Sequence, residues 1–252
     1  MYGIVLVTRA GIASAGICSA RPGSRLCTYS ARPRTTDNRA ARHPGVAPRG
    51  AQAHAMAAPA AALRPPVRGL TVTAVIGLMA ATGLRISECM ALNVTDVDSA
   101  ADVLAVTGKR GRPRLVPIHP STTTALADYR QAATALVDKP DGTALFLTWT
   151  GTRAHAGNIE VAFRSLTVAL GYTPQPGGQP PRLHDMRHSF STNTLIRAHR
   201  DGADVDATVA VLATYLGHVS PASTYWYLTA TPQLLELTAT KVAAAQQDGR
   251  LL

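Results

Sequence analysis

Cysteine and long apolar runs are scarce in this chain of 252 residues. Its three cysteines, Cys18, Cys27 and Cys89, are odd in number and lack CxxC or Cys/His spacing, which argues against a disulfide framework and a zinc site. The longest apolar run, LTVTAVIGLMAATGL, stops at Arg85, short of the roughly 20 residues that a membrane span needs. We therefore expect a protein of the reducing cytoplasm, neither secreted nor embedded in a membrane.

Acidic residues are almost absent from the first part of the chain. Residues 1–70 hold ten arginines, no lysine and a single acid, Asp37, and so carry nine of the ten net positive charges. A balance this basic usually points to a polyanionic partner such as nucleic acid. Because the rest of the chain is nearly neutral, a DNA-binding prediction for the folded part depends on where its few cations lie.

Apolar periodicity is also missing from residues 1–66, which are rich in Ala, Arg, Gly and Pro. A segment without a repeating apolar face cannot bury enough surface to offset the conformational entropy that it loses on folding. We expect this low-complexity segment to be disordered. One alternative stays open, namely that it stems from an out-of-frame or misplaced start in GC-rich DNA.

Regular patterns begin at Leu70 and predict a mainly α domain with one small antiparallel β-sheet, an α+β fold. VLAVT and RLVPI flank GKRGRP, which is the pattern of a β-hairpin, and ALFLT is a short strand or extended run. Helical spacing of apolar residues predicts helices in TVTAVIGLMAA, ISECMAL, residues 120–137, NIEVAFRSLTVAL, LHDMRHSFSTNTLIRA, DATVAVLATYL, PASTYWYL and PQLLELTATKVAAAQQ.

Five short stretches hold side chains that could act on a phosphate: ATGLRISE, TGKRGRPR, LHDMRHSF, YLGHVS and TYWYL. Residues three apart on a helix share a face, so His184 and Arg187 point the same way. Each stretch taken alone has a plain structural explanation: a solvated pair, a helix-end charge at Arg85, or a core histidine at His218. Their common order and spacing carry more weight than any one of them.

Together these stretches resemble the catalytic domain of the tyrosine recombinases, the phage-integrase family, from about residue 69 to 245. TGLRISE matches the family's first arginine motif, the hairpin carries its lysine, and HDMRH matches its HxLRH box with Met186 in place of leucine. LGH supplies the second histidine, with the tyrosine nine residues later. The resemblance implies the catalytic residues Arg85, Lys109, His184, Arg187, His218 and Tyr227, supported by Glu88 and His188.

Two tyrosines stand in TYWYL, but the chemistry needs one nucleophile. Residues two apart on a helix point to roughly opposite sides, so Tyr225 and Tyr227 cannot both face the cations. The family spacing selects Tyr227. We assign Tyr225 and Trp226 to packing.

The resemblance implies that DNA strands are cleaved and rejoined through a 3′-phosphotyrosyl intermediate, without a metal ion, another cofactor or ATP. Attack of a phenol on a phosphodiester builds negative charge on the non-bridging oxygens, which planar guanidinium groups can hold bidentately. Arg85 and Arg187 are expected to do so, with His184 and His218 as further donors. His184 is the expected acceptor of the tyrosine proton, and Lys109 the expected donor to the departing 5′ oxygen.

The hairpin adds Arg110, Arg112 and Arg114, which we predict to bind DNA. Cationic side chains on a narrow ribbon fit the minor groove and the backbone beside it, although a solvated hairpin face is the alternative. The expected partners are double-stranded DNA and further copies of the chain on paired sites, with possible exchange of a C-terminal helix. The expected location is the cytoplasm, at the nucleoid.

The family's separate core-binding domain has no recognisable counterpart in residues 1–66. We therefore divide the chain into this low-complexity segment and a catalytic domain at 67–252. Three functions stay open: a site-specific recombinase or integrase, a type IB topoisomerase-like enzyme, and a truncated remnant that at most binds DNA. Relaxation of supercoiled DNA without recombinants would identify the second.

Overall fold

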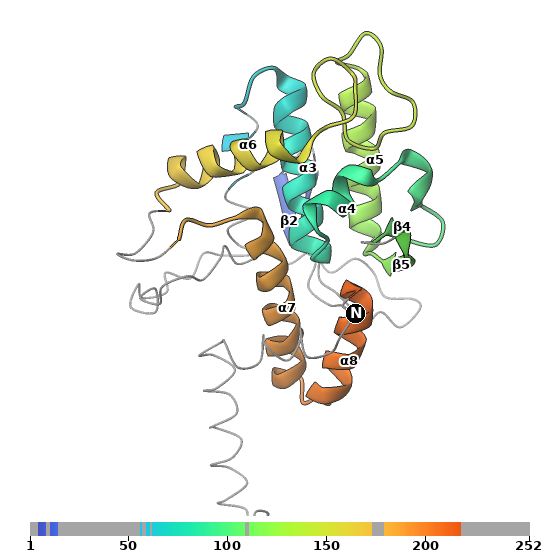
Figure 1. Ribbon diagram of the computed structural model, residues 1–252, viewed down its shortest axis with the longest axis vertical. Helices are drawn as coiled ribbons and strands as arrows, with labels where there is room; N and C mark the ends of the chain where they lie inside the picture. Colours follow the sequence, from blue (N-terminus) through green and yellow to red (C-terminus); the bar gives the residue numbers. More distant parts are fainter. Residues whose placement is uncertain are drawn as a thin grey trace, which may run out of the picture.

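The computed structural model describes residues 5–8, 11–14, 56, 59–60, 62–108, 111–172 and 179–217. This part of the chain is mainly helical with a small antiparallel sheet, which confirms the predicted fold class (Figure 1). Its elements are β1 (Val5–Thr8), β2 (Gly11–Ser14), α3 (Pro66–Thr82), α4 (Ile86–Ala91), the short 3-10 helix η1 (Val94–Asp96), β3 (Val97–Asp98), β4 (Val103–Thr107), β5 (Pro113–Pro117), α5 (Pro120–Thr134), α6 (Ala156–Ala169), α7 (Leu183–Arg200) and α8 (Val205–Leu216).

Helix α3 forms the centre of the described domain. Thirteen of its 17 residues are buried, and it packs against both α5 and α7 (Figure 1). A helix that is apolar around most of its circumference is stable only when neighbours cover it on several sides. It ends at Gly83, whose φ of 64° is left-handed and whose N–H donates to the Met79 carbonyl. This turn leads directly into Arg85 and α4.

The small sheet has the strand order β3-β4-β5, and both pairs are antiparallel. Leu104, Val106 and Val116 point from it into the core, as the alternation of side chains along a strand requires. The proline-bounded strand β5 lies at the edge, where a missing N–H is tolerated. The hairpin between VLAVT and RLVPI is therefore confirmed, with its tip residues Lys109 and Arg110 outside the described part.

A hydrogen-bonded triad joins α3, α5 and the segment after α5. The Thr71 hydroxyl donates to the Leu147 carbonyl at 2.8 Å, and the Tyr129 hydroxyl lies 3.0 Å from Thr71 and accepts from the Leu147 N–H at 2.9 Å. In ALFLT, Ala144 pairs with Asn93 and Leu147 pairs with Arg153 in isolated bridges, and the chain bends between them. ALFLT therefore forms no continuous strand.

Helices α7 and α8 pack against each other, and α7 also packs on α3 (Figure 1). Helix α8 begins at Asp204, whose carboxylate accepts from the N–H groups of Asp206 and Ala207, and it ends at Gly217 with a left-handed φ of 65°. Both helices were predicted from their apolar spacing. The two helices predicted after them lie outside the described residues.

Near the N-terminus, β1 and β2 form a two-stranded hairpin with β1 beside α3 and α5. Little else of residues 1–66 is described, so disorder of this segment and the domain boundary at 67 stay predictions.

In the described part of the chain, no helix is long and apolar enough to cross a membrane.

Candidate active site

Arg85 occupies the turn between α3 and α4 and caps α4. Its backbone N–H donates to Glu88 Oε2 at 3.0 Å, and its Nη1 donates to Glu88 Oε1 at 3.0 Å. The side chain of Arg85 is 32% exposed, whereas that of Glu88 is 3% exposed. A buried carboxylate therefore holds an arginine that still reaches the surface.

Arg187 projects from the first turns of α7 and is buried. Its Nη1 donates to the Gly83 carbonyl at 2.8 Å, and its Nη2 donates to the Leu216 carbonyl at 2.6 Å. Neither acceptor carries a full charge, so these bonds orient the guanidinium group without neutralising it. The end of α3 and the end of α8 are both fastened to this one side chain.

His184 lies one turn before Arg187 on α7, and its ring meets that of His188 edge-on at a centroid distance of 5.1 Å. Partial burial and then the charge of Arg187 lower the pKa of His184, with a smaller opposing effect from Asp185. The pKa of His188 is also lowered, by burial and then by His184. Lowered values favour neutral imidazoles, and a neutral imidazole can accept a proton.

The predicted site residues in the described part come together. Arg187 bonds to the carbonyl of Gly83, two residues before Arg85, so the start of α7 and the α3–α4 turn lie together, and Arg85, His184 and Arg187 are referred to as the cation cluster after the two arginines. Glu88 bonds to Arg85, and the ring of His188 contacts that of His184. Lys109, Arg110, His218 and Tyr227 lie outside the described residues, and the roles of all the site residues stay predictions.

Arg114 lies on β5 and points inward, with 15% of its side chain exposed. Its Nη1 and Nη2 donate to Glu88 Oε1 and Oε2 at 3.0 and 2.9 Å, and its Nε donates to the Tyr215 carbonyl at 3.0 Å. All three guanidinium nitrogens thus bond within the protein. Arg112, two residues earlier, is exposed. These contacts do not test the predicted DNA binding, but they reveal a role for Arg114 that sequence reasoning missed.

Glu88 accepts from both arginines, and its ionisation reflects them. Burial by itself raises the pKa of this carboxyl group, but hydrogen bonds from Arg114 and from the Arg85 backbone, with the charges of both residues, lower it overall. Glu88 is therefore held as a carboxylate. One buried negative charge therefore lies between two arginines, Arg85 and Arg114.

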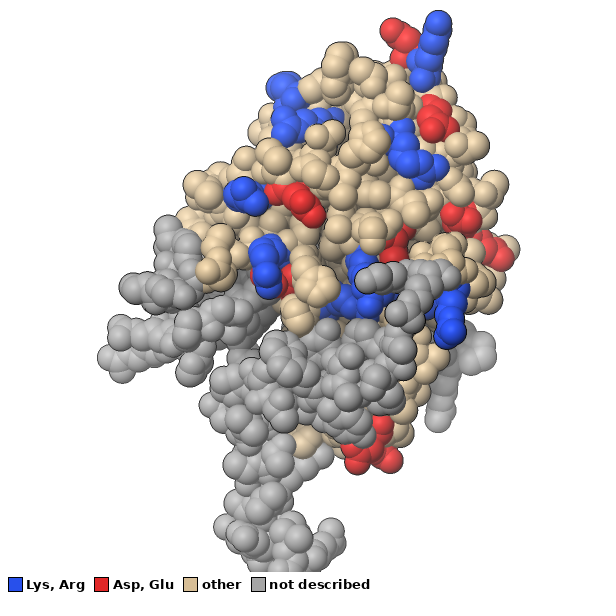
Figure 2. Space-filling view, in the orientation of Figure 1, with Lys and Arg blue, Asp and Glu red and all other residues tan. Residues whose placement is uncertain are grey.

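Positive and negative side chains are mixed on the visible face of the described part (Figure 2). On the face shown in Figure 2, Lys and Arg side chains are interspersed with Asp and Glu and form no continuous basic field. Within the described ranges, no three His, Cys, Asp or Glu side chains gather in an arrangement that could hold a metal ion.

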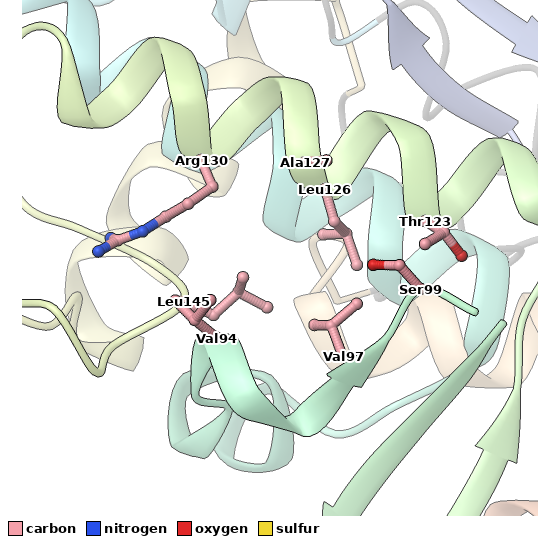
Figure 3. Close-up of a pocket in the computed structure, with 8 residues that line it drawn as sticks. All are labelled: Val94, Val97, Ser99, Thr123, Leu126, Ala127, Arg130 and Leu145. Atoms are coloured by element: carbon pink, nitrogen blue, oxygen red, sulfur yellow. The ribbon is translucent and has the colours of Figure 1, made fainter. Parts of the chain in front are cut away.

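A separate pocket of about 340 Å³ lies between α5 and the η1–β3 segment (Figure 3). Val94, Val97 and Leu126 give it an apolar interior, whereas the Arg130 guanidinium points away from them and donates to the Asp141 carbonyl. None of the predicted site residues in the described ranges lines this pocket. It is distinct from the cation cluster.

Comparison with known proteins supplies independent information. The model of the phage integrase family matches residues 57–233. A Sinorhizobium fredii protein named integrase/recombinase y4rB is 38% identical over 187 residues, which cover 72% of this chain and 59% of that protein. Tyrosine recombinase XerC of Roseiflexus sp. is 35% identical over 158 residues, covering 61% and 46%. The chain thus spans less than two thirds of the length of these curated relatives.

Solved structures show the same fold. The crystal structure of XerA recombinase superimposes with a TM-score of 0.60 at 24% identity, covering 79% of this chain and 66% of that one. XerH recombinase, in a post-cleavage complex with palindromic difH substrate, gives 0.60 at 17% identity, covering 81% and 55%. At these identities the likeness shows the architecture, that of a tyrosine recombinase catalytic domain.

Proposed function

The chain belongs to the phage integrase family, and on this premise we propose that it is a site-specific DNA strand transferase that acts through a 3′-phosphotyrosyl intermediate. The observation that carries the proposal is the hydrogen bond from Arg187 Nη1 on α7 to the carbonyl of Gly83, which lies two residues before Arg85 and 104 residues before Arg187 in sequence. This contact joins the start of α7, with His184 and Arg187, to the turn that leads into Arg85.

The two arginines suit a phosphodiester in its transition state. As the phosphorus becomes five-coordinate, negative charge grows on its non-bridging oxygens, and guanidinium groups already fixed in place stabilise it without reorganisation. Hydrogen bonds to Glu88 and to backbone carbonyls fix Arg85 and Arg187 respectively. Each donor of this kind is worth on the order of 10²–10³ in rate.

The proposed reaction is a transesterification. The Tyr227 oxygen attacks phosphorus and gives its proton to His184, while the bond to the 5′ oxygen breaks and that oxygen takes a proton from Lys109. One phosphate ester replaces another, so the bond energy is retained. The 5′ hydroxyl of a second strand can then reverse the step and complete strand exchange.

The proposed partners are double-stranded DNA and further copies of the chain. XerH is bound to difH substrate, and a lambda integrase dimer is bound to a COC′ core site. We extend DNA binding and assembly on paired sites to this chain, and place its action in the cytoplasm at the nucleoid. Within the proposal, the apolar C-terminal residues Leu234, Leu235, Leu237 and Val242 dock on a neighbouring copy.

The decisive experiment tests the nucleophile on a nicked suicide DNA that traps the covalent intermediate. Tyr227→Phe removes only the phenolic oxygen, so covalent capture should be abolished while non-covalent DNA affinity is retained. Tyr225→Phe is the matched control and should still form an adduct that resists denaturant. The adduct is measured by its retarded migration in a denaturing gel.

Three results would contradict the proposal. An adduct that persists in Tyr227→Phe but vanishes in Tyr225→Phe would falsify the assigned nucleophile. An unsubstituted chain that binds DNA carrying a cognate site but never forms an adduct would favour the inactive remnant. Relaxation of a supercoiled plasmid without recombinant products would instead favour a topoisomerase-like enzyme.

A further inference from the structure

Arg114 joins three segments that the family's chemistry depends on. It lies on β5, the second strand of the hairpin that leads from Lys109, and it binds Glu88 on α4 and the Tyr215 carbonyl near the end of α8. These partners are 26 and 101 residues away in sequence. One side chain thus connects the arginine turn, the hairpin and the approach to His218.

The contact with Glu88 acts on Arg85 indirectly. Glu88 Oε1 accepts from both Arg85 Nη1 and Arg114 Nη1, and Oε2 accepts from the Arg85 backbone and Arg114 Nη2. The carboxylate is therefore held in one orientation by two arginines. If Arg114 were removed, Glu88 would be free to rotate toward Arg85 or toward water, and the Arg85 guanidinium group would lose its fixed direction.

The contact with α8 acts on Arg187 in the same way. Arg114 holds the carbonyl of Tyr215, and Arg187 holds the carbonyl of the next residue, Leu216. A Cβ added at Gly217 would lie 3.1–3.3 Å from the Arg114 guanidinium group, so the side chain is packed tightly against this turn. Arg114 and Arg187 thus clamp two consecutive peptide groups just before His218.

We propose that Arg114 is a positioning residue that aligns Arg85 and Arg187 on one phosphate, and that it does not contact DNA. The inference rests on the proposed strand-transfer function. It assigns two of the three hairpin arginines different roles: Arg112 is exposed and available to DNA, whereas all three guanidinium nitrogens of Arg114 bond within the protein. Lysine cannot replace it, because an ammonium group cannot span two carboxylate oxygens and a carbonyl in one plane.

The test uses the full chain with Arg114→Lys and Arg114→Met, and Arg112→Met as the matched surface variant. DNA affinity is measured over a range of salt concentrations. Loss of a phosphate contact lowers the salt slope by about one, so this is expected for Arg112→Met, whereas both Arg114 variants should keep the parent slope. A lowered slope in the Arg114 variants would show direct DNA contact and overturn the proposal.

The rate of adduct formation on saturating suicide DNA tests positioning itself. A misplacement of about 1 Å costs on the order of 100-fold, and a loss of this size is expected in both Arg114 variants. Asp204→Ala destabilises α8 at its far end and serves as the stability control, with an unchanged rate expected below its unfolding temperature. If the parent forms the adduct and Arg114→Lys forms it at the same rate, the positioning role of Arg114 is refuted.

A third measurement does not require catalysis. It can therefore test the Glu88–Arg114 contact even if the proposed strand-transfer function is wrong. Urea unfolding midpoints are compared for Glu88→Gln, Arg114→Met and the double variant. If the two side chains interact directly, the shifts in midpoint will not add. Arg114→Met should then shift the midpoint less in the Glu88→Gln variant than it does in the parent. Additive shifts would refute the Glu88–Arg114 link even if no adduct forms with any variant.

Discussion

At the scale of single residues, Gly83 places a functional carbonyl where no other residue fits. Its φ is +64°, and an added Cβ would lie 2.6 Å from Phe190 Cδ1 and 3.1 Å from Leu216 Cδ2. Gly83→Ala should therefore cost more than the roughly 1–2 kcal/mol of a left-handed alanine, because Phe190 must also move. The free energy of unfolding in urea checks this.

Gly202→Ala is the control for Gly83, since its φ is +71° and its added Cβ would meet nothing within 4 Å. Its loss in the free energy of unfolding should reflect only the cost of the left-handed backbone. Equal losses in the two variants would mean that the ring of Phe190 is not a constraint. Gly83→Ala should also slow adduct formation, because the carbonyl that orients Arg187 shifts.

Single residues also show what sequence can and cannot predict. The resemblance to the tyrosine recombinases predicts Arg85, His184 and Arg187 as site residues, and the structure places Arg187 against the turn that leads into Arg85. The inward role of Arg114 was not foreseen, because its acid partner lies 26 residues away and nothing in a basic hairpin indicates which cation turns inward. A sequence pattern predicts only local geometry, whereas the contact between Arg114 and Glu88 depends on how the sheet packs on α4.

At the scale of elements, α8 depends on its N-terminal cap. The Asp204 carboxylate accepts from two N–H groups of the first turn, at 2.9 and 3.1 Å. Asp204→Ala should lower the free energy of unfolding by about 1 kcal/mol, whereas Asp204→Asn should stay near the parent because asparagine caps comparably. Thermal unfolding of the parent and the two variants measures the change in stability. If Asp204→Asn loses as much stability as Asp204→Ala, the charge of Asp204 and not its capping hydrogen bonds stabilises α8.

Helices were predicted well where apolar spacing is continuous, and their ends less well. Helix α5 was expected to reach Val137 but ends at Thr134. The chain continues in tighter bonds, from Leu136 N–H to the Ala133 carbonyl and from Val137 N–H to Thr134. Apolar spacing does not distinguish this closing turn from another turn of α-helix, since both keep side chains on the same side.

At the scale of the whole molecule, Glu88 links stability to pH. Its pKa in the folded protein lies below the ordinary value of 4.5, because the arginine hydrogen bonds and charges outweigh burial. A lowered folded pKa means that the unfolded chain binds the proton more readily, so this contribution is complete above pH 4.5 and is lost as pH falls through the folded value. Stability should therefore fall in acid.

Glu88→Gln removes this titration, so its unfolding midpoint should depend less on pH between 7 and 3 than that of the parent. Urea unfolding at several pH values provides the comparison. The variant should also be less stable at pH 7, because a neutral amide leaves both arginines without their counter-charge. Parallel pH profiles for the two proteins would show that Glu88 is not the titrating group.

Arg187 and Arg114 are anchored in different ways, and this predicts different patterns of covariation among relatives. Arg187 is held by main-chain oxygens at Gly83 and Leu216, and a carbonyl is offered whatever side chain stands at position 216. Arg114 is held chiefly by the side chain of Glu88, so a change in one requires a compensating change in the other. Coevolution across relatives should therefore register the pair Glu88–Arg114 and miss the contact between Arg187 and the main chain of Leu216.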